Sequence, residues 1–219
     1  MTVVKLVVVG MYNTGKTSLI KRYTKDTFES NCRSTIGIEL VTKSESIEGQ
    51  TVDIQLWDTA GAEKFQSMVP VYYKKAHGAI IVFDAFKRKS FEEVDKLYKN
   101  INEGASNKNL PILIVANKID RQAERQVSEE EGLEKAKQLG APYIETSAKT
   151  GHNCRDMFIK LVTLCIEANL SQDSQMQTAG QGNDGPIGVP SRRRRSTRRR
   201  PNEIDLGEGG ETKSCLCFS

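Results

Sequence analysis

Residues 10–17, Gly-Met-Tyr-Asn-Thr-Gly-Lys-Thr, match the pattern G-x-x-x-x-G-K-[ST] directly after an apolar run and before a helical pattern. The glycines let backbone N–H groups converge on phosphate oxygens, and the following helix presents its positive end to them. Lys16 neutralises phosphate charge in such a loop, and the Thr17 hydroxyl ligates Mg²⁺. Asn13 lies where the loop needs a positive φ, which asparagine tolerates. The sequence therefore predicts a site for a nucleoside phosphate with Mg²⁺.

A second motif, Asn117-Lys118-Ile119-Asp120, follows another apolar run, at the sheet edge where open α/β folds bind ligands. The Asp120 carboxylate can accept hydrogen bonds from N1–H and the exocyclic amine of guanine, whereas adenine offers a repelling lone pair at N1. Ser147, Ala148 and Lys149 follow a further strand pattern and can close the base site with a backbone N–H and an alkyl wall. The predicted base is guanine.

Three residues between these motifs suit the metal and the terminal phosphate. Asp58 ends an apolar strand pattern, where its carboxylate orients a metal-bound water. Gly61 permits a backbone N–H to approach the terminal phosphate. Thr35 lies in a polar stretch, where its hydroxyl ligates Mg²⁺ when the γ-phosphate is present. We therefore expect Thr17, Thr35 and Asp58 to form the metal site.

The elements that position these residues follow from the apolar runs, most of which lack clean alternation, as expected for strands buried on both faces. Strands are predicted at Val3–Gly10, Val52–Trp57, Ala79–Asp84, Pro111–Asn117 and Tyr143–Glu145. Between residues 36 and 57, two strand-like runs flank a turn-like spacer, Glu48–Thr51, which predicts one antiparallel hairpin. The predicted fold is α/β: a six-stranded, mostly parallel sheet with one antiparallel hairpin strand and helices on both faces.

Helices are predicted at Phe91–Glu103, Glu129–Leu139 and about Cys154–Ala168. Ser90 with Glu93, and Ser128 with Glu131, fit the S-x-x-E capping box, in which each side chain bonds across the first turn. Gly140 follows the second helix and should end it.

The length of 219 residues suits one domain with some chain left over, because domains usually hold roughly 100–200 residues.

No run approaches the roughly 20 apolar residues of a membrane-spanning helix. Lys5 interrupts the apolar start and no small-residue cleavage site follows, so we expect no signal peptide and a protein that stays in the cytosol unless something else attaches it to a membrane. The five cysteines are scattered without paired histidine spacing, so reduced thiols are expected rather than disulfides or a zinc site.

The domain is predicted to span residues 1–170 and a disordered tail residues 171–219. The tail is dominated by polar, glycine, proline and charged residues, with too few apolar residues to offset the entropy of ordering. Its segment Ser191–Arg200 holds seven arginines and no acid, whereas the whole chain has a net charge of only +4.

Taken in order, these motifs resemble those of a small GTPase of the Ras superfamily, most like the Rab branch. The Rab likeness rests on TIGIEL (35–40), IQLWDTAG (54–61) and VYYKKAHGAIIVFD (71–84). The resemblance covers about residues 1–170 and implies a P-loop G domain that hydrolyses GTP to GDP and phosphate.

The resemblance also implies roles for individual residues. Phe28 would pack against the guanine ring, and residues 30–39 and 61–74 would be two switch segments that order around GTP and loosen after hydrolysis. Effectors, an exchange factor and an activating protein would bind these segments. The implied nucleotide-binding residues are Gly10, Tyr12, Asn13, Thr14, Gly15, Lys16, Thr17, Ser18, Phe28, Thr35, Asp58, Gly61, Asn117, Lys118, Asp120, Ser147, Ala148 and Lys149. Lys16, Thr35 and Gly61 would act in the chemical step together with position 62.

Two departures from the family bear on hydrolysis. Ala62 stands where the family usually has a glutamine that orients the attacking water, and alanine cannot hold a water by hydrogen bonding. Tyr12 stands where small residues are usual, beside the expected γ-phosphate and in the path of an arginine finger. We expect slow intrinsic hydrolysis. Alternatively, Ala62 is harmless, because Rab-activating proteins supply a glutamine of their own.

Cys215 and Cys217, near the end of the sequence, resemble the Cys-x-Cys prenyl acceptors of Rab proteins. The C-a-a-X form is absent, so prenylation and S-palmitoylation both stay open. Two lipids, or one lipid with a basic patch, anchor a protein stably, and each arginine near anionic lipid contributes on the order of 1 kcal/mol. The arginine run is also compatible with a solvated segment, a nuclear import signal or non-specific nucleic-acid contact.

The sequence thus predicts a monomeric, Rab-like GTP-binding switch in vesicle traffic, without specific nucleic-acid binding. We expect it on the cytoplasmic face of an endomembrane or the plasma membrane, with a cytosolic pool. Two alternatives remain: a GTP-bound scaffold that hardly hydrolyses, and a Ras-like signalling protein at the plasma membrane.

Overall fold

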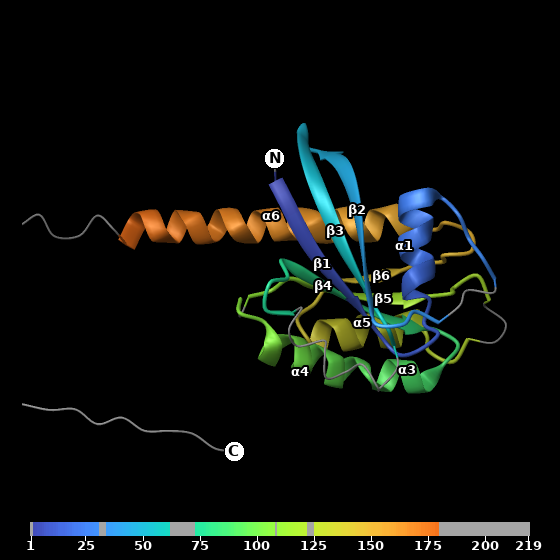
Figure 1. Cartoon of the computed structure of the whole chain (residues 1–219). Helices are drawn as coiled ribbons and strands as arrows, with labels where there is room; N and C mark the ends of the chain where they lie inside the picture. The colour runs from blue at the N-terminus through green and yellow to red at the C-terminus, as the bar shows by residue number, and fades with distance from the viewer. Residues whose placement is uncertain (1, 31–33, 62–72, 108, 122–124, 180–219) are drawn as a thin grey trace, which may run out of the picture. The chain divides into compact units, whose positions relative to one another are not determined.

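A six-stranded sheet forms the centre of the described part of the chain in this computed structural model (Figure 1). The strands are β1 (Thr2–Val9), β2 (Ile38–Ile47), β3 (Gln50–Thr59), β4 (Gly78–Asp84), β5 (Ile112–Asn117) and β6 (Tyr143–Glu145). Their order is β2-β3-β1-β4-β5-β6, with β2 antiparallel to β3 and the other neighbouring pairs parallel. The predicted fold class is confirmed.

The structure describes residues 2–30, 34–61, 73–107, 109–121 and 125–179, with side chains up to residue 168. The chain divides into two units, residues 1–181 and 182–219, so all described residues belong to the first unit. Among them, no helix combines the length and the apolar character that a membrane span requires.

The predicted hairpin is present, with a tighter connection than expected. Ile47 pairs with Gln50, so the connection is Glu48-Gly49 and the last two residues of the predicted spacer belong to β3. Glu48 has φ 51° and Gly49 has φ 78°. Positive φ at both central residues is typical of two-residue hairpin loops whose twist matches that of the strands. The prediction missed this because Gln and Thr suit a strand end as well as a turn.

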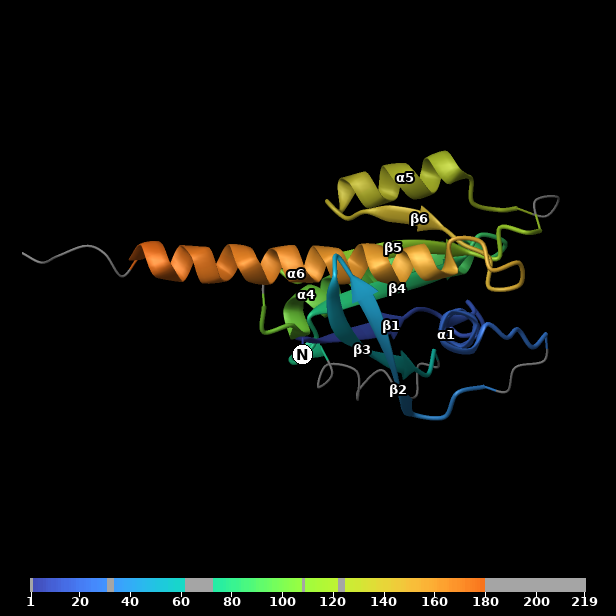
Figure 2. The ribbon, with the colours of Figure 1, turned by 90° about the horizontal axis from the view of Figure 1, so that it is seen from above.

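The described helices are α1 (Lys16–Lys25), α3 (Arg88–Glu92), α4 (Val94–Gly104), α5 (Glu129–Gln138) and α6 (Cys154–Ala179). Apolar residues of α1 and α6 pack on one face of the sheet, and those of α3, α4 and α5 pack on the other. Figure 2 shows α5 beside β6 at one edge of the sheet and the β2–β3 hairpin at the other. The prediction of helices on both faces is confirmed.

The central strands β1, β4 and β5 lack clean alternation because they are covered on both sides. Every residue of β4 and β5 is buried. In β1, Leu6 and Val8 face α1 and α6, whereas Val7 and Val9 face the opposite helices. Since β1, β3, β4, β5 and β6 run parallel, the segments that follow them leave from the same edge of the sheet, where open α/β folds bind ligands.

The predicted cap at Ser90 is wrong. Ser90 lies inside α3, and the single helix predicted at 91–103 is divided into α3 and α4 at Glu93. The buried Ser90 hydroxyl accepts a hydrogen bond from the Asp84 N–H at 3.0 Å and lies 2.7 Å from the Lys87 carbonyl oxygen. The hydroxyl is therefore used to fix the end of β4, which a local pattern does not reveal.

The second predicted cap is confirmed. The Ser128 hydroxyl accepts from the Glu131 N–H, and the Glu131 carboxylate accepts from the Ser128 N–H. Helix α5 ends at Gln138, one residue earlier than predicted, and Gly140 has φ 64°, as a residue ending a helix often does.

The last helix is longer than predicted. Helix α6 continues to Ala179, eleven residues past the expected end, and overlaps the first nine residues of the predicted tail. Residues 169–179 contain neither glycine nor proline, so nothing in the backbone chemistry stops the helix before Gly180. The predicted end of this helix, at about Ala168, was wrong because a polar composition argues against packing into a core but not against helical hydrogen bonding. The rest of the predicted tail lies outside the described residues.

Candidate nucleotide-binding site

The loop at residues 10–17 joins β1 to α1 and requires both of its glycines. Gly10 has φ +153°, and a Cβ there would lie 2.2 Å from the carbonyl oxygen of Val82. Gly15 has φ +92°, and a Cβ there would lie 2.4 Å from the side-chain nitrogen of Asn117. Gly15 is the N-cap of α1 and offers no side-chain hydrogen bond to the first turn. The start of α1 thus presents backbone N–H groups, an arrangement suited to binding an anion.

The Lys16 ammonium is buried under this loop. Its Nζ donates to the carbonyl oxygens of Gly10 at 3.0 Å and Met11 at 3.2 Å. Burial lowers the pKa of Lys16 from its usual range to about 8, and the charge of Asp58 opposes that shift. A buried cation with an incomplete set of counter-charges favours a bound anion, so Lys16 is suited to a phosphate.

The three predicted metal ligands meet at one point. Thr17 Oγ1 donates to Asp58 Oδ2 at 2.6 Å and lies 2.8 Å from Thr35 Oγ1, which itself lies 3.4 Å from Asp58 Oδ2. These residues come from the start of α1, from the segment before β2 and from the end of β3.

The chemistry of this cluster fits Mg²⁺. Asp58 Oδ1 is buried without a hydrogen-bond partner, and burial raises the pKa of the Asp58 carboxyl. A divalent cation would satisfy that oxygen. Within the described residues, no group of three or more His, Cys, Asp or Glu could hold a metal. One carboxylate and two hydroxyls match the preference of Mg²⁺ for a few protein oxygens completed by phosphate and water.

The predicted base-binding residues also lie together. Ser147 Oγ donates to Asp120 Oδ1 at 2.7 Å, and Lys149 Nζ lies 3.9 Å from Asp120 Oδ2. The Asn117 side chain joins this group to the phosphate loop, because it accepts from the Ala148 N–H at 3.2 Å and donates to the Thr14 carbonyl at 2.8 Å. The base and phosphate motifs therefore form one continuous site.

Lys118 makes a second link between the two motifs. It has φ 71°, and its Nζ donates to the Asn13 carbonyl at 2.7 Å. Asn13 has φ 62°, as the sequence predicted. Lys118 Nζ also forms an ion pair with the buried Asp84 at 2.7 Å. Asp84 was not predicted as a site residue, although a carboxylate at the end of a fully apolar strand was a usable signal, as it was for Asp58.

Gly61 packs directly on the phosphate loop. A Cβ at this position would lie 2.6 Å from both Lys16 Nζ and the Tyr12 backbone nitrogen. Only a residue without a side chain fits so close to the loop, which agrees with the predicted approach of the Gly61 backbone to a terminal phosphate.

Tyr12 contacts the segment that holds Thr35. Its side chain is half exposed, and its hydroxyl lies 3.3 Å from the Ser34 Oγ that donates to it. Phe28 is 37% exposed, and Ser18 lies in the first turn of α1. The predicted contacts of Phe28 and Ser18 with a nucleotide stay predictions.

Several predicted residues lie outside the described part of the chain. They are Ala62 and most of the segment 61–74, residues 31–33 of the other switch segment, the arginine run and the cysteines Cys215 and Cys217.

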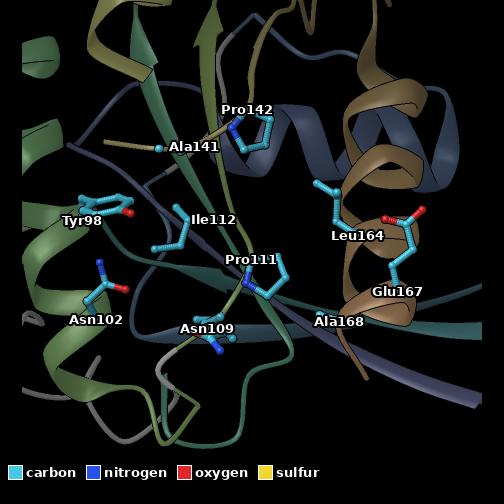
Figure 3. A pocket seen from close by; sticks show the side chains of 12 residues that line it. Tyr98, Asn102, Asn109, Pro111, Ile112, Ala141, Pro142, Leu164, Glu167 and Ala168 are labelled. Carbon is cyan, nitrogen blue, oxygen red and sulfur yellow. The ribbon is translucent and has the colours of Figure 1, made fainter. Parts of the chain in front are cut away.

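A pocket of about 450 Å³ lies away from this site, beside the amino-terminal ends of β5 and β6 (Figure 3). Tyr98 of α4 and Leu164 of α6 line it, together with the prolines Pro111 and Pro142. None of the predicted site residues belongs to it.

The comparison with known protein families decides the identity of the fold. Residues 5–167 match the model of the Ras family. The chain belongs to the Ras family. This Ras-family chain is also similar to the Ras-related protein Rab-12 of Mus musculus and of Rattus norvegicus, each 38% identical over 159 residues. The match spans 72% of this chain and 65% of each relative. The predicted likeness to the Rab branch is confirmed.

Proposed function

We propose that this Ras-family protein is a Rab-like switch that binds GTP and GDP with Mg²⁺ and hydrolyses GTP to GDP and phosphate. The observation that supports this most is the meeting of Thr17, Thr35 and Asp58 beside the phosphate loop, in a site that Asn117 joins to Asp120. Segments far apart in the sequence would thus supply a phosphate cradle, a metal site and a guanine acceptor at one sheet edge.

Each part of the site has a distinct task in this proposal. The Lys16 ammonium and the first turn of α1 balance phosphate charge, and Gly61 brings its backbone to the terminal phosphate. Thr17, Thr35 and Asp58 would hold Mg²⁺ directly or through water, and the ion would neutralise charge between the β- and γ-phosphates. Asp120, held by Ser147, would accept from the guanine N1–H and amine.

The same geometry supports a proposed switch between two states. Thr35 and Gly61 sit in the two predicted switch segments and contact the metal cluster and the phosphate loop. Loss of the γ-phosphate would remove the group that holds both segments in place. Effectors, an exchange factor and an activating protein would distinguish the two states through these segments.

Hydrolysis is proposed to be slow. The Tyr12 side chain stands at the phosphate loop, and its hydroxyl contacts Ser34 beside Thr35. From that position it would narrow the space for an attacking water or an arginine finger. Ala62 cannot orient the water by hydrogen bonding. If turnover is absent altogether, the protein is a GTP-bound scaffold rather than a cycling enzyme.

Attachment to membranes is proposed to come from the segment beyond the described residues. Lipids on Cys215 and Cys217 would act with the seven arginines of residues 191–200 to hold the protein on a cytoplasmic membrane face. The likeness to Rab-12 favours vesicle traffic on endomembranes over signalling at the plasma membrane.

Base recognition offers the sharpest test of the proposed site. Asp120→Asn should weaken GDP binding and favour xanthosine diphosphate, which carries an acceptor where guanine has its amine. Asp53→Asn is the matched control, because Asp53 accepts from Ser44 on the hairpin, outside the site. Equilibrium titration with both nucleotides should show the change of preference in the first variant alone. Unchanged preference after Asp120→Asn would refute the assigned base site.

A further inference from the structure

Arg22, in the last turn of α1, makes long-range contacts that the nucleotide site does not by itself explain. Its Nε donates to the Ala148 carbonyl at 3.0 Å and its Nη2 to the Lys149 carbonyl at 2.9 Å. Its Nη1 donates to the Asp26 carbonyl at 3.1 Å and to Asp26 Oδ1 at 3.0 Å. The Arg22 side chain is only 18% exposed. All three guanidinium nitrogens are therefore engaged, two of them with the predicted base loop.

These bonds close a ring around the proposed site. Arg22 holds the Ala148 carbonyl, and the N–H of Ala148 donates to Asn117. Asn117 in turn donates to the Thr14 carbonyl, two residues before α1 begins. The ring returns to Arg22 through the helix itself. Since the planar guanidinium fixes two adjacent carbonyls at once, the base loop has one preferred position relative to the phosphate loop.

We propose that Arg22 is a positioning residue that clamps the base loop, residues 147–149, onto the helix that follows the phosphate loop, and thereby sets how long a guanine nucleotide stays bound. The inference rests on the proposed function of the site. Arg22 touches neither the predicted metal ligands nor Asp120 in the described contacts, so its effect on nucleotide acts through Ala148 and Lys149.

The contact with Asp26 suggests a competing role for Arg22 that can be separated. Asp26 is the C-cap of α1, and its side chain is 91% exposed. If Arg22 acted mainly through its ion pair with the Asp26 side chain, removing the Asp26 carboxylate would have as large an effect as removing Arg22. Asp26→Asn tests this, because asparagine tolerates the αL conformation that Asp26 adopts at φ 52°.

The test compares release of N-methylanthraniloyl-GDP, chased with excess GDP in Mg²⁺, from wild type and four variants. Arg22→Ala should speed release at least about tenfold, since two charge-assisted hydrogen bonds to the base loop are lost. The release rate of Arg22→Lys should lie within about threefold of that of Arg22→Ala, because an ammonium cannot bridge both carbonyls as a guanidinium does. Asp26→Asn and Arg155→Ala, the latter removing a pair with Glu45 outside the site, should release at the wild-type rate.

A second measurement, amide hydrogen exchange, reports directly on the base loop that Arg22 contacts and does not depend on nucleotide release. Amide hydrogen exchange at residues 147–151 should accelerate in Arg22→Ala and stay unchanged in the two control variants. Failure of wild type to bind GDP would overturn the proposed function, whereas unchanged exchange at 147–151 in Arg22→Ala would overturn the clamp alone. Release from Arg22→Ala at the wild-type rate, or equal acceleration by Asp26→Asn, would also overturn it.

Discussion

Removing the charge of Asp84 should loosen nucleotide without dismantling the fold. Asp84 Oδ2 lies 2.7 Å from Lys118 Nζ, while its Oδ1 accepts from the Phe86 N–H at 2.9 Å. Asp84→Asn keeps the shape and one acceptor oxygen, which can still serve the Phe86 N–H, so the loss falls on the Lys118 contact. The Lys118 ammonium would then depend on the Asn13 carbonyl and on water.

The expected magnitude lies between those of exposed and buried ion pairs. Exposed pairs contribute about 0–1 kcal/mol, and breaking a buried pair costs about 3–5 kcal/mol. The Asp84 side chain is 8% exposed and that of Lys118 is 25% exposed, so water can partly replace the lost partner of the ammonium. We therefore expect a net loss of about 1–2 kcal/mol, which corresponds to release of GDP about 5- to 30-fold faster.

The assay is release of fluorescent GDP at 25 °C, with thermal unfolding measured on the same samples. Asp53→Asn serves as the control, because it removes an equal charge from the hairpin, where Asp53 accepts from Ser44. A release rate for Asp84→Asn within twofold of wild type, in a folded protein, would show that the Asp84–Lys118 pair does not hold the site together.

Three further outcomes are expected. Burial, aided by a nearby lysine, lowers the pKa of His77 below its usual 6.5, so the folded state prefers the neutral imidazole. The melting temperature of the wild type should therefore fall as the pH drops below about 6.5, and it should fall less in His77→Gln. Equal pH profiles of the melting temperature in the two proteins would contradict this expectation. Replacing Cys215 and Cys217 together with serine should move the tagged protein from membranes to the cytosol, and continued membrane binding would exclude a lipid anchor at these residues. Phosphate release in single-turnover assays should be slow in the wild type. Ala62→Gln should restore the rate partly, and adding Tyr12→Gly should restore it more fully. Wild-type hydrolysis as fast as in glutamine-bearing relatives would show that another residue positions the water.

The sheet and the meeting of the site residues were predictable because both follow from local patterns joined by one topological rule. Apolar runs without alternation indicated strands covered on both faces, and parallel strands place their carboxyl ends at one edge. Residues 10–17 and Asp120 follow such strands, and Asp58 lies at the carboxyl end of the parallel strand β3, so their proximity followed from the fold class. Thr35 does not follow a strand, so its prediction as a metal ligand rested on its hydroxyl in a polar stretch and on the family resemblance, not on the topology of the sheet.

The missed features depend on contacts between distant segments. The Ser90 hydroxyl accepts a hydrogen bond from the Asp84 N–H at the end of β4, and no helix-capping pattern in the sequence can show this contact. Asp84 carried a signal as a carboxylate at the end of an apolar strand, but its partner Lys118 was known only from the pairing of β4 with β5. Arg22 contacts backbone carbonyl groups more than 120 residues away in the sequence. Every residue has a backbone carbonyl, so no sequence pattern indicates which of them accepts these hydrogen bonds.

The measurement that tests the central claim most directly is the affinity of the purified protein for GDP and for ADP, each in Mg²⁺. A site that hydrogen-bonds the guanine edge through Asp120 should prefer GDP by a factor on the order of 10³ or more, because adenine would leave the carboxylate unpaired. Removal of Mg²⁺ should weaken GDP binding, since Thr17 and Asp58 would lose the cation that joins them to phosphate. Equal affinity for the two nucleotides would contradict the account.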